Sequence, residues 1–209
     1  MKNKLYLIII LFFIESLQII AQDLKSNKLI SLDKIEEINV QIDNIIERFY
    51  LYDEHIFKPD KESGNFSSKH KRIDKRTNEL KLLKELNEPF DSTFYAQSSQ
   101  TWYKNNMKDK IEIDIFICPS YTKLDELISL FTTKYYSVPF TITDVAVAGE
   151  KSWIPLMKQQ NANSSVLMFR FKNIFVKVFV SLENKNELIV EDLIEEIGIN
   201  IEDKIKMIS

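Results

Sequence analysis

The sequence predicts an α+β fold, with an antiparallel sheet of about five strands, packed helices and an N-terminal helical segment in front. Three patterns lead to this prediction. Apolar residues recur at helical spacing from Leu32 to Tyr52, alternate with a period of two from position 111, and return to helical spacing after Leu188. We therefore expect residues 22–90 to form a helical segment with a basic loop and residues 91–209 to form the α+β domain.

The first 21 residues have the three parts of a secretory signal peptide. Lys2 and Lys4 form a basic start, Leu5 to Ile14 is an unbroken apolar run, and Ala21 is a small residue at the expected cleavage position. We expect residues 1–21 to be removed on export. The mature protein would then be periplasmic or extracellular, with no stable membrane insertion.

An uncut signal anchor is the alternative at this end of the chain. Ile19, close to the expected cut, is larger than the alanine that is usual there. A complete membrane span is not expected, because Glu15 interrupts the apolar run and a span needs roughly 20 apolar residues. A lipid anchor at the new N-terminus is not expected either, since the only cysteine is Cys118.

The N-terminal helical segment is expected to contain two helices with a basic loop between them. The first spans residues 32–52, and its apolar face consists of Ile35, Ile38, Ile42, Ile45, Ile46 and Phe49. Apolar content then falls, so Lys58 to Arg76 is predicted to be a mobile loop. A second helix is expected over residues 74–87, with Leu80, Leu83 and Leu86 on one face and Pro89 after its end.

The second half begins with a predicted strand. Isoleucines at positions 111, 113, 115 and 117 alternate with Glu112, Asp114 and Phe116, which is typical of a strand with one buried face. An upstream strand over residues 93–103 is expected to pair with it. A helix that opens at Pro119 and Ser120 is expected next, and residues 140–148 are expected to form another strand.

The clearest local element is a hairpin from Val166 to Ser181. With Lys172 and Asn173 as a two-residue turn, three apolar pairs lie on one side of the sheet. These pairs are Phe171 with Ile174, Phe169 with Val176, and Leu167 with Val178. The other side carries a mixed set that is solvated, covered by a helix or used for binding: Met168, Arg170, Phe175, Lys177 and Phe179. A final helix follows, in which Gly198 costs about 1 kcal/mol relative to alanine.

Composition argues against several kinds of site. The chain has only three glycines, isolated from one another, so no glycine-rich phosphate loop can be formed. His55 and His70 are the only histidines, which excludes a three-histidine zinc site. Cys118 is expected to be a small buried hydrophobe. We therefore expect no cofactor and no metal.

The remaining catalytic arrangements have simpler explanations. Asp53, Glu54 and His55 are expected to lie at a solvated helix end. Ser120 and Lys123 have the spacing of a lysine-activated serine, but chance accounts for such a match in a chain rich in both residues. A non-catalytic protein is therefore favoured over an enzyme. A small exported hydrolase with acidic catalytic residues is the alternative, because two carboxylates about 5–9.5 Å apart in a cleft suffice for glycoside hydrolysis.

Charge is unevenly distributed along the chain, although the net charge is only −3. The region from Lys58 to Glu85 is predominantly basic, whereas Glu183 to Asp203 is strongly acidic. Export argues against a nucleic acid partner, and the basic region lacks interleaved aromatic residues. The candidate binding residues are Lys69, Lys71, Arg72, Lys75, Arg76, Arg170, Phe175, Lys177 and Phe179.

These observations predict an exported, non-catalytic protein that binds another protein or an envelope component. The alternatives are the small hydrolase and a membrane-tethered accessory subunit with an uncut signal anchor. The sequence predicts neither the specific partner nor the oligomeric state.

Overall fold

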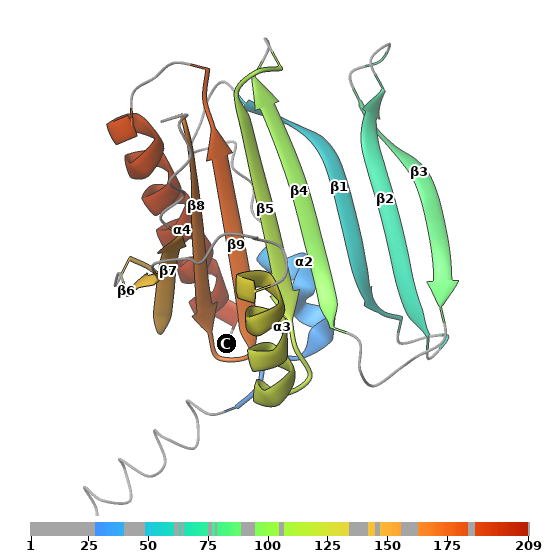
Figure 1. The fold of residues 1–209 in the computed structure, drawn as a ribbon. Coiled ribbons are helices and arrows are strands. Elements are labelled where there is room, and N and C mark those ends of the chain that lie inside the picture. The colour runs from blue at the N-terminus through green and yellow to red at the C-terminus, as the bar shows by residue number, and fades with distance from the viewer. Residues whose placement is uncertain are drawn as a thin grey trace, which may run out of the picture.

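Nine strands in the described part of the chain form one continuous antiparallel sheet (Figure 1). The computed structural model describes residues 28–39, 49–60, 63, 65–74, 77, 79–88, 95–104, 107–133, 142–144, 147–155, 163–183 and 187–208. From one edge to the other the strand order is β3-β2-β1-β4-β5-β9-β8-β7-β6. The predicted fold class, with about five strands and an N-terminal helical segment, is therefore wrong.

The strands are β1 (Phe49–Pro59), β2 (Phe66–Asp74), β3 (Glu79–Glu88), β4 (Ala96–Lys104), β5 (Lys110–Ile117), β6 (Ile142–Asp144), β7 (Lys151–Pro155), β8 (Ser164–Phe171) and β9 (Ile174–Ser181). The described helical elements are η1 (Leu32–Lys34), α2 (Ile35–Ile38), α3 (Tyr121–Thr133) and α4 (Glu187–Ile208). The strand expected over residues 140–148 is present only as the short β6, with residues 140, 141, 145 and 146 outside the described part.

The β8–β9 hairpin forms in the predicted register. Phe171 pairs with Ile174, Phe169 with Val176, and Leu167 with Val178. Lys172, the first turn residue, has a φ of 52°, in the left-handed region that few non-glycine residues adopt. The apolar pairs specify the register here, because a slip by one residue would move every buried side chain to the other face.

β5 lies at the centre of the sheet, between β4 and β9. The predicted pairing of β4 with β5 is confirmed, and Ile113 lies between Gln100 of β4 and Val178 of β9. The isoleucines at positions 111, 113, 115 and 117 are all buried on one face of this strand. The alternating pattern therefore predicted both the strand and its buried side.

We call the sheet face covered by α2 and α4 the helix face. The predicted C-terminal helix is confirmed as α4, which buries Val190, Ile194, Ile197, Ile201 and Ile205 in the main core. A Cβ atom at Gly198 would lie 2.5 Å from Leu167 Cδ2 of β8. Gly198 therefore lets α4 approach the sheet closely, which explains a glycine inside a helix.

We call the opposite sheet face the α3 face. A second core forms where α3 contributes Leu124 and Leu127, and the strands contribute Phe116, Val166, Met168 and Phe175. The rings of Phe116 and Phe175 each lie 5.3 Å from that of Phe131 between centroids, near the end of α3. Met168 and Phe175, two members of the mixed hairpin surface, are thus covered by a helix.

The predicted helix over residues 32–52 is wrong. Helical geometry ends at Asn39, where ψ is 123°, and residues from Phe49 onwards belong to β1. Aromatic residues such as Tyr50 and Tyr52 favour extended backbone when neighbouring strands are available for pairing, and β1 has β2 and β4 beside it. Ile42, Ile45 and Ile46 lie outside the described residues.

The predicted mobile loop and the helix over residues 74–87 are also wrong, because this region contains the hairpin of β2 and β3. Leucine, lysine and glutamate form helices readily, so the composition of β3 favours a helix locally. In the folded chain, sheet pairing overrides that preference and opposite charges meet across the strands. Lys69 lies 3.2 Å from Glu85, and Lys81 lies 2.5 Å from Asp74.

The division expected between residues 90 and 91 falls between β3 and β4, which belong to the same sheet. The described residues of 22–90 are therefore part of the same sheet-based architecture as those of 91–209. The signal peptide expected at residues 1–21 lies outside the described residues.

The buried side chain of Asn173 joins three parts of the chain at the end of the β8–β9 hairpin. Its Oδ1 accepts a hydrogen bond from the Ile30 N–H at 2.7 Å, and its Nδ2 donates to the carbonyls of Ile30 (2.8 Å) and Cys118 (2.6 Å). Its own carbonyl accepts from the Cys118 N–H at 2.9 Å. Asn173 is 1% exposed, so water cannot easily replace these bonds.

Replacing this side chain tests the junction. We expect Asn173→Ala to lower the free energy of unfolding by about 2–4 kcal/mol, because three buried backbone groups lose their partner. Urea denaturation followed by circular dichroism measures the change. Asn200→Ala on α4 is the control, since Asn200 makes an exposed bond to the Glu196 carbonyl. Equal effects of the two substitutions would contradict the assigned role of Asn173.

Candidate functional site

We call β1, β2 and β3 together the arm, because these strands extend the sheet away from α3 and α4. α4 packs on β8 and β9, α3 contacts β9, and α2 packs on β1, β4 and β5. Figure 1 shows β2 and β3 at the far side of the sheet from α3 and α4. The outer strands of the arm, β2 and β3, thus have little helical cover in the described fold.

β3 exposes every side chain described for it, at residues 79–86. Leu80, Leu82, Leu83 and Leu86 are 37–55% exposed, and they make up four of the nine large hydrophobic residues exposed in the described part of the chain. A strand without a buried side chain contributes little to the core, because stabilisation scales with the apolar area removed from water. The concentration of leucines on one edge strand is therefore the most unusual surface feature of the described fold.

On the α3 face of the arm, Asp53 connects two basic side chains of β2. Strand register places Asp53 opposite Arg72 and His55 opposite His70. Arg72 Nε donates to Asp53 Oδ2 at 2.7 Å, and His70 Nε2 lies 2.7 Å from Asp53 Oδ1. This carboxylate therefore holds the two strands together from the open side of the sheet.

The polar row continues from β1 towards β9 on the same face. His55 Nε2 lies 2.9 Å from Ser68 Oγ. On the neighbouring strands, Ser99 Oγ donates to Asp114 Oδ1 at 2.7 Å, and Lys177 Nζ donates to Asp114 Oδ2 at 3.1 Å. Cross-strand pairs of this kind stabilise a sheet and fix the positions of its side chains.

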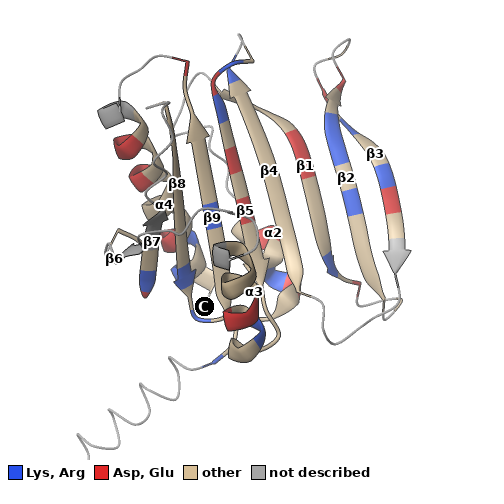
Figure 2. Cartoon of the chain, in the orientation of Figure 1, with Lys and Arg blue, Asp and Glu red and all other residues tan. Residues whose placement is uncertain are grey.

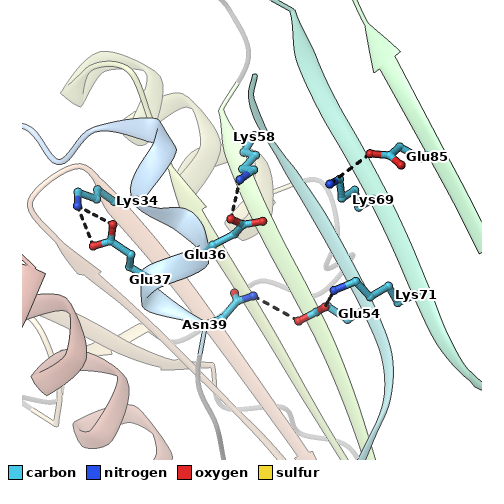
Figure 3. Close-up of polar contacts among 9 residues, drawn as sticks. All are labelled: Lys34, Glu36, Glu37, Asn39, Glu54, Lys58, Lys69, Lys71 and Glu85. Atoms are coloured by element: carbon cyan, nitrogen blue, oxygen red, sulfur yellow. Dashed lines mark hydrogen bonds and ion pairs between the residues drawn. The ribbon is translucent and has the colours of Figure 1, made fainter. Parts of the chain in front are cut away.

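On the helix face, a buried carboxylate connects the arm to α2 (Figure 3). Glu54 is 8% exposed and accepts hydrogen bonds from Lys71 (3.0 Å), Asn39 (3.3 Å) and Gln100 (3.3 Å). Lys58 also donates to Glu36 of α2 at 2.6 Å. Polar contacts therefore fix β1 on both faces of the sheet. Asp53 makes them on the α3 face, and Glu54 and Lys58 make them on the helix face.

The predicted basic site does not form one patch. Lys69 and Lys71 lie on the helix face, paired with Glu85 and Glu54, whereas Arg72 lies on the α3 face with Asp53. Lys75 and Arg76 lie outside the described residues.

The other four predicted site residues lie at the opposite side of the sheet. Arg170 pairs with Asp125 (3.4 Å) and Glu150 (3.9 Å), and Lys177 pairs with Asp114. Phe175 is buried in the second core, and Phe179 packs against it. Strand order therefore separates these four residues from the basic residues of β2, and a binding role for each remains a prediction.

Sequence reasoning missed the exposed leucines of β3 as a surface. Leu80, Leu83 and Leu86 have the spacing of a helix stripe, and that pattern hid the strand. The available signal was the opposite charge of Lys69 and Glu85, which face each other in the hairpin register, and of Asp74 and Lys81, which form an ion pair across the two strands.

The described residues contain no group of three or more His, Cys, Asp or Glu that could hold a metal ion. Asp53 and Glu54 lie within β1, not at a helix end, and their partners lie on opposite faces of the sheet. Burial raises the pKa of Cys118 to about 12, so this thiol stays protonated at neutral pH. None of the helices described is both long enough and apolar enough to span a membrane.

Comparison with protein-family models, with curated proteins and with solved structures finds no match to this chain.

The histidines of the arm predict an acid-dependent loss of stability. Burial lowers the pKa of His55 below its usual 6.5, the nearby His70 adds to the effect, and Asp53 partly opposes it. The unfolded chain therefore binds a proton at His55 more readily than the folded chain. Stability from this group is present above about pH 6.5 and is lost as the pH falls towards the lower folded-state pKa.

We expect His55→Gln to remove this contribution. Urea denaturation of both proteins between about pH 7.5 and about pH 5 should show the wild type losing stability relative to the variant as the pH falls. If the stability of the two proteins changes with pH in parallel over that range, protonation of His55 is not coupled to folding.

Unequal burial on the helix face of the arm predicts unequal effects for two glutamates. Glu54→Ala leaves Asn39 and Gln100 donors without their acceptor, so we expect a loss of about 2 kcal/mol in the free energy of unfolding. Glu85→Ala removes the same group from a pair whose side chains are 41% and 48% exposed, so we expect a loss of no more than about 0.5 kcal/mol. Thermal and urea denaturation measure both. A loss of stability from Glu85→Ala as large as that from Glu54→Ala would contradict the stabilising role assigned to the buried hydrogen bonds of Glu54.

Proposed function

We propose that this chain is an exported, non-catalytic binding protein and that the arm is its recognition surface for another protein. The observation that carries the proposal is the exposure of four leucines on β3, a strand that contributes no described side chain to either core.

An exposed edge strand with apolar side chains is a hazard for a protein that acts alone. Such edges template pairing with other chains, and natural proteins usually shorten, cover or charge them. At the opposite edge of this sheet, the described part of β6 is short, with three residues. β3 has ten residues and keeps its leucines. A surface of this kind is typical of a site that binds a partner.

The polar contacts of the arm support a binding surface that is already ordered before the partner binds. Asp53 connects β1 to β2, and Glu54 connects β1 to Lys71, Asn39 and Gln100. Side chains and strands that are already positioned lose less conformational entropy when a partner arrives. The arm can therefore present β3 in one geometry.

The expected export signal restricts the partner class. A protein outside the cytoplasm meets envelope proteins and secreted proteins, and the leucines of β3 suit contact with a protein surface more than with a sugar or a nucleic acid. The location itself rests on the sequence pattern of residues 1–21.

Photocrosslinking in intact cells tests the proposal. A photoreactive amino acid placed at Leu82 or Leu86 should give a discrete adduct of constant size. The same group at Ile199, an exposed position on α4, is the matched control and should give no such adduct. Adducts that are equally strong from α4 and from β3, or none from β3, would overturn the assignment of the arm as the binding surface.

A further inference from the structure

We propose that β3 binds an extended segment of the partner as an added strand, and that this segment alternates apolar and acidic residues. The inference rests on the proposed function and specifies both the mode of binding and the chemistry of the partner.

The backbone of β3 is available for strand addition. In the described part of the chain, β3 is the last strand of the sheet and pairs with β2 on one side. Alternate residues of such a strand direct their N–H and C=O groups outwards, where an extended peptide can bond to them. Ten residues provide a pairing length above that of an average strand.

On the helix face, the first half of β3 carries apolar side chains. Leu80 pairs with Ile73, and Leu82 pairs with Lys71 of β2. Both leucines remain largely exposed, at 37% and 52%. A neighbouring strand would contact them with its own side chains on that face, so apolar residues at every second position of the partner segment fit.

On the α3 face, β3 carries two lysines, Lys81 and Lys84, with Glu79 beside Lys81 at the start of the strand. Lys81 pairs with Arg72 and Lys84 pairs with His70, so the two lysines lie beside basic residues of β2 at the edge of the sheet. Figure 2 shows blue bands of Lys and Arg on β2 and β3, with a red band on β3 as well. Asp53 and Asp74 neutralise part of this charge, through Arg72 and Lys81. Acidic residues of an added strand would lie directly opposite the lysines, where opposite charges stabilise the pairing.

The same charges argue against a second copy of this chain as the occupant. Two copies paired through β3 by two-fold symmetry would place Lys81 and Lys84 of both molecules on one face of the joined sheet, together with Glu79 of both, and a register that sets the lysines opposite one another is disfavoured. Like charges on neighbouring positions destabilise strand pairing. A partner with acidic side chains removes that repulsion.

The test uses blocked ten-residue peptides and the intact protein. The first probe alternates valine and glutamate, and the second has the same sequence with N-methyl groups on alternate residues, which removes backbone donors. Fluorescence anisotropy should show binding of the first probe only. Hydrogen exchange should show slower exchange of β3 amides when that probe is bound.

Charge reversal adds specificity to the test. We expect Lys81→Glu combined with Lys84→Glu to weaken binding of the valine–glutamate peptide by about tenfold and to strengthen binding of a valine–lysine peptide. Lys123→Glu combined with Lys206→Glu changes the net charge equally on α3 and α4 and should leave both affinities unchanged. Circular dichroism verifies the folding of each variant.

Three results would overturn the inference. They are equal binding of the N-methylated peptide, no binding of the valine–glutamate peptide, or a dimer whose slowed amides map to β3. The proposed function fails separately, through the crosslinks described above. Crosslinks from β3 without slowed β3 amides would retain the binding surface and exclude strand addition.

Discussion

The pairing of β5 with β9 is the contact on which the rest of the structure depends. It joins segments such as Asp114 and Lys177 that are 63 residues apart, and both cores are built on it. The isoleucines and valines of the two strands face α4, whereas Phe116 and Phe175 face α3. Asn173 closes the end of this pair by binding Ile30 and Cys118. Because one pair of strands supplies both faces, a change there would reach every layer of the fold.

The arm and the centre of the sheet are stabilised by different forces. At the centre, apolar side chains on both faces leave water, and that burial is the larger source of stability. In the arm, Ile56 and Phe66 are buried, and specific polar contacts at Asp53 and Glu54 add modest net stability and a defined geometry. The arm therefore combines a fixed shape with an accessible edge, which is the combination that a recognition surface requires.

The sequence predicted those elements whose local pattern and tertiary environment agree. Alternation in β5, β8 and β9 coincides with a buried face, and the periodicity of α4 coincides with the core. It failed at β3, where Leu80, Leu83 and Leu86 have helical spacing while β2 provides a pairing partner. The candidate site was missed for the same reason, because exposed leucines on a strand look like the buried stripe of a helix. The buried role of Glu54 depends on Asn39 and Gln100, which no local pattern connects to it.

The strand order also governs how the chain can fold as it is synthesised. The β2–β3 and β4–β5 hairpins need only short loops, so they can form early, whereas β5 must wait for β9 near the end of the chain. From that early stage onwards the growing chain presents β3 with its leucines and its unpaired edge. Lys81 and Lys84 interrupt that apolar stretch, and charges in such positions disfavour aggregation of incompletely folded chains. The same two lysines thus act during folding, before any partner is available.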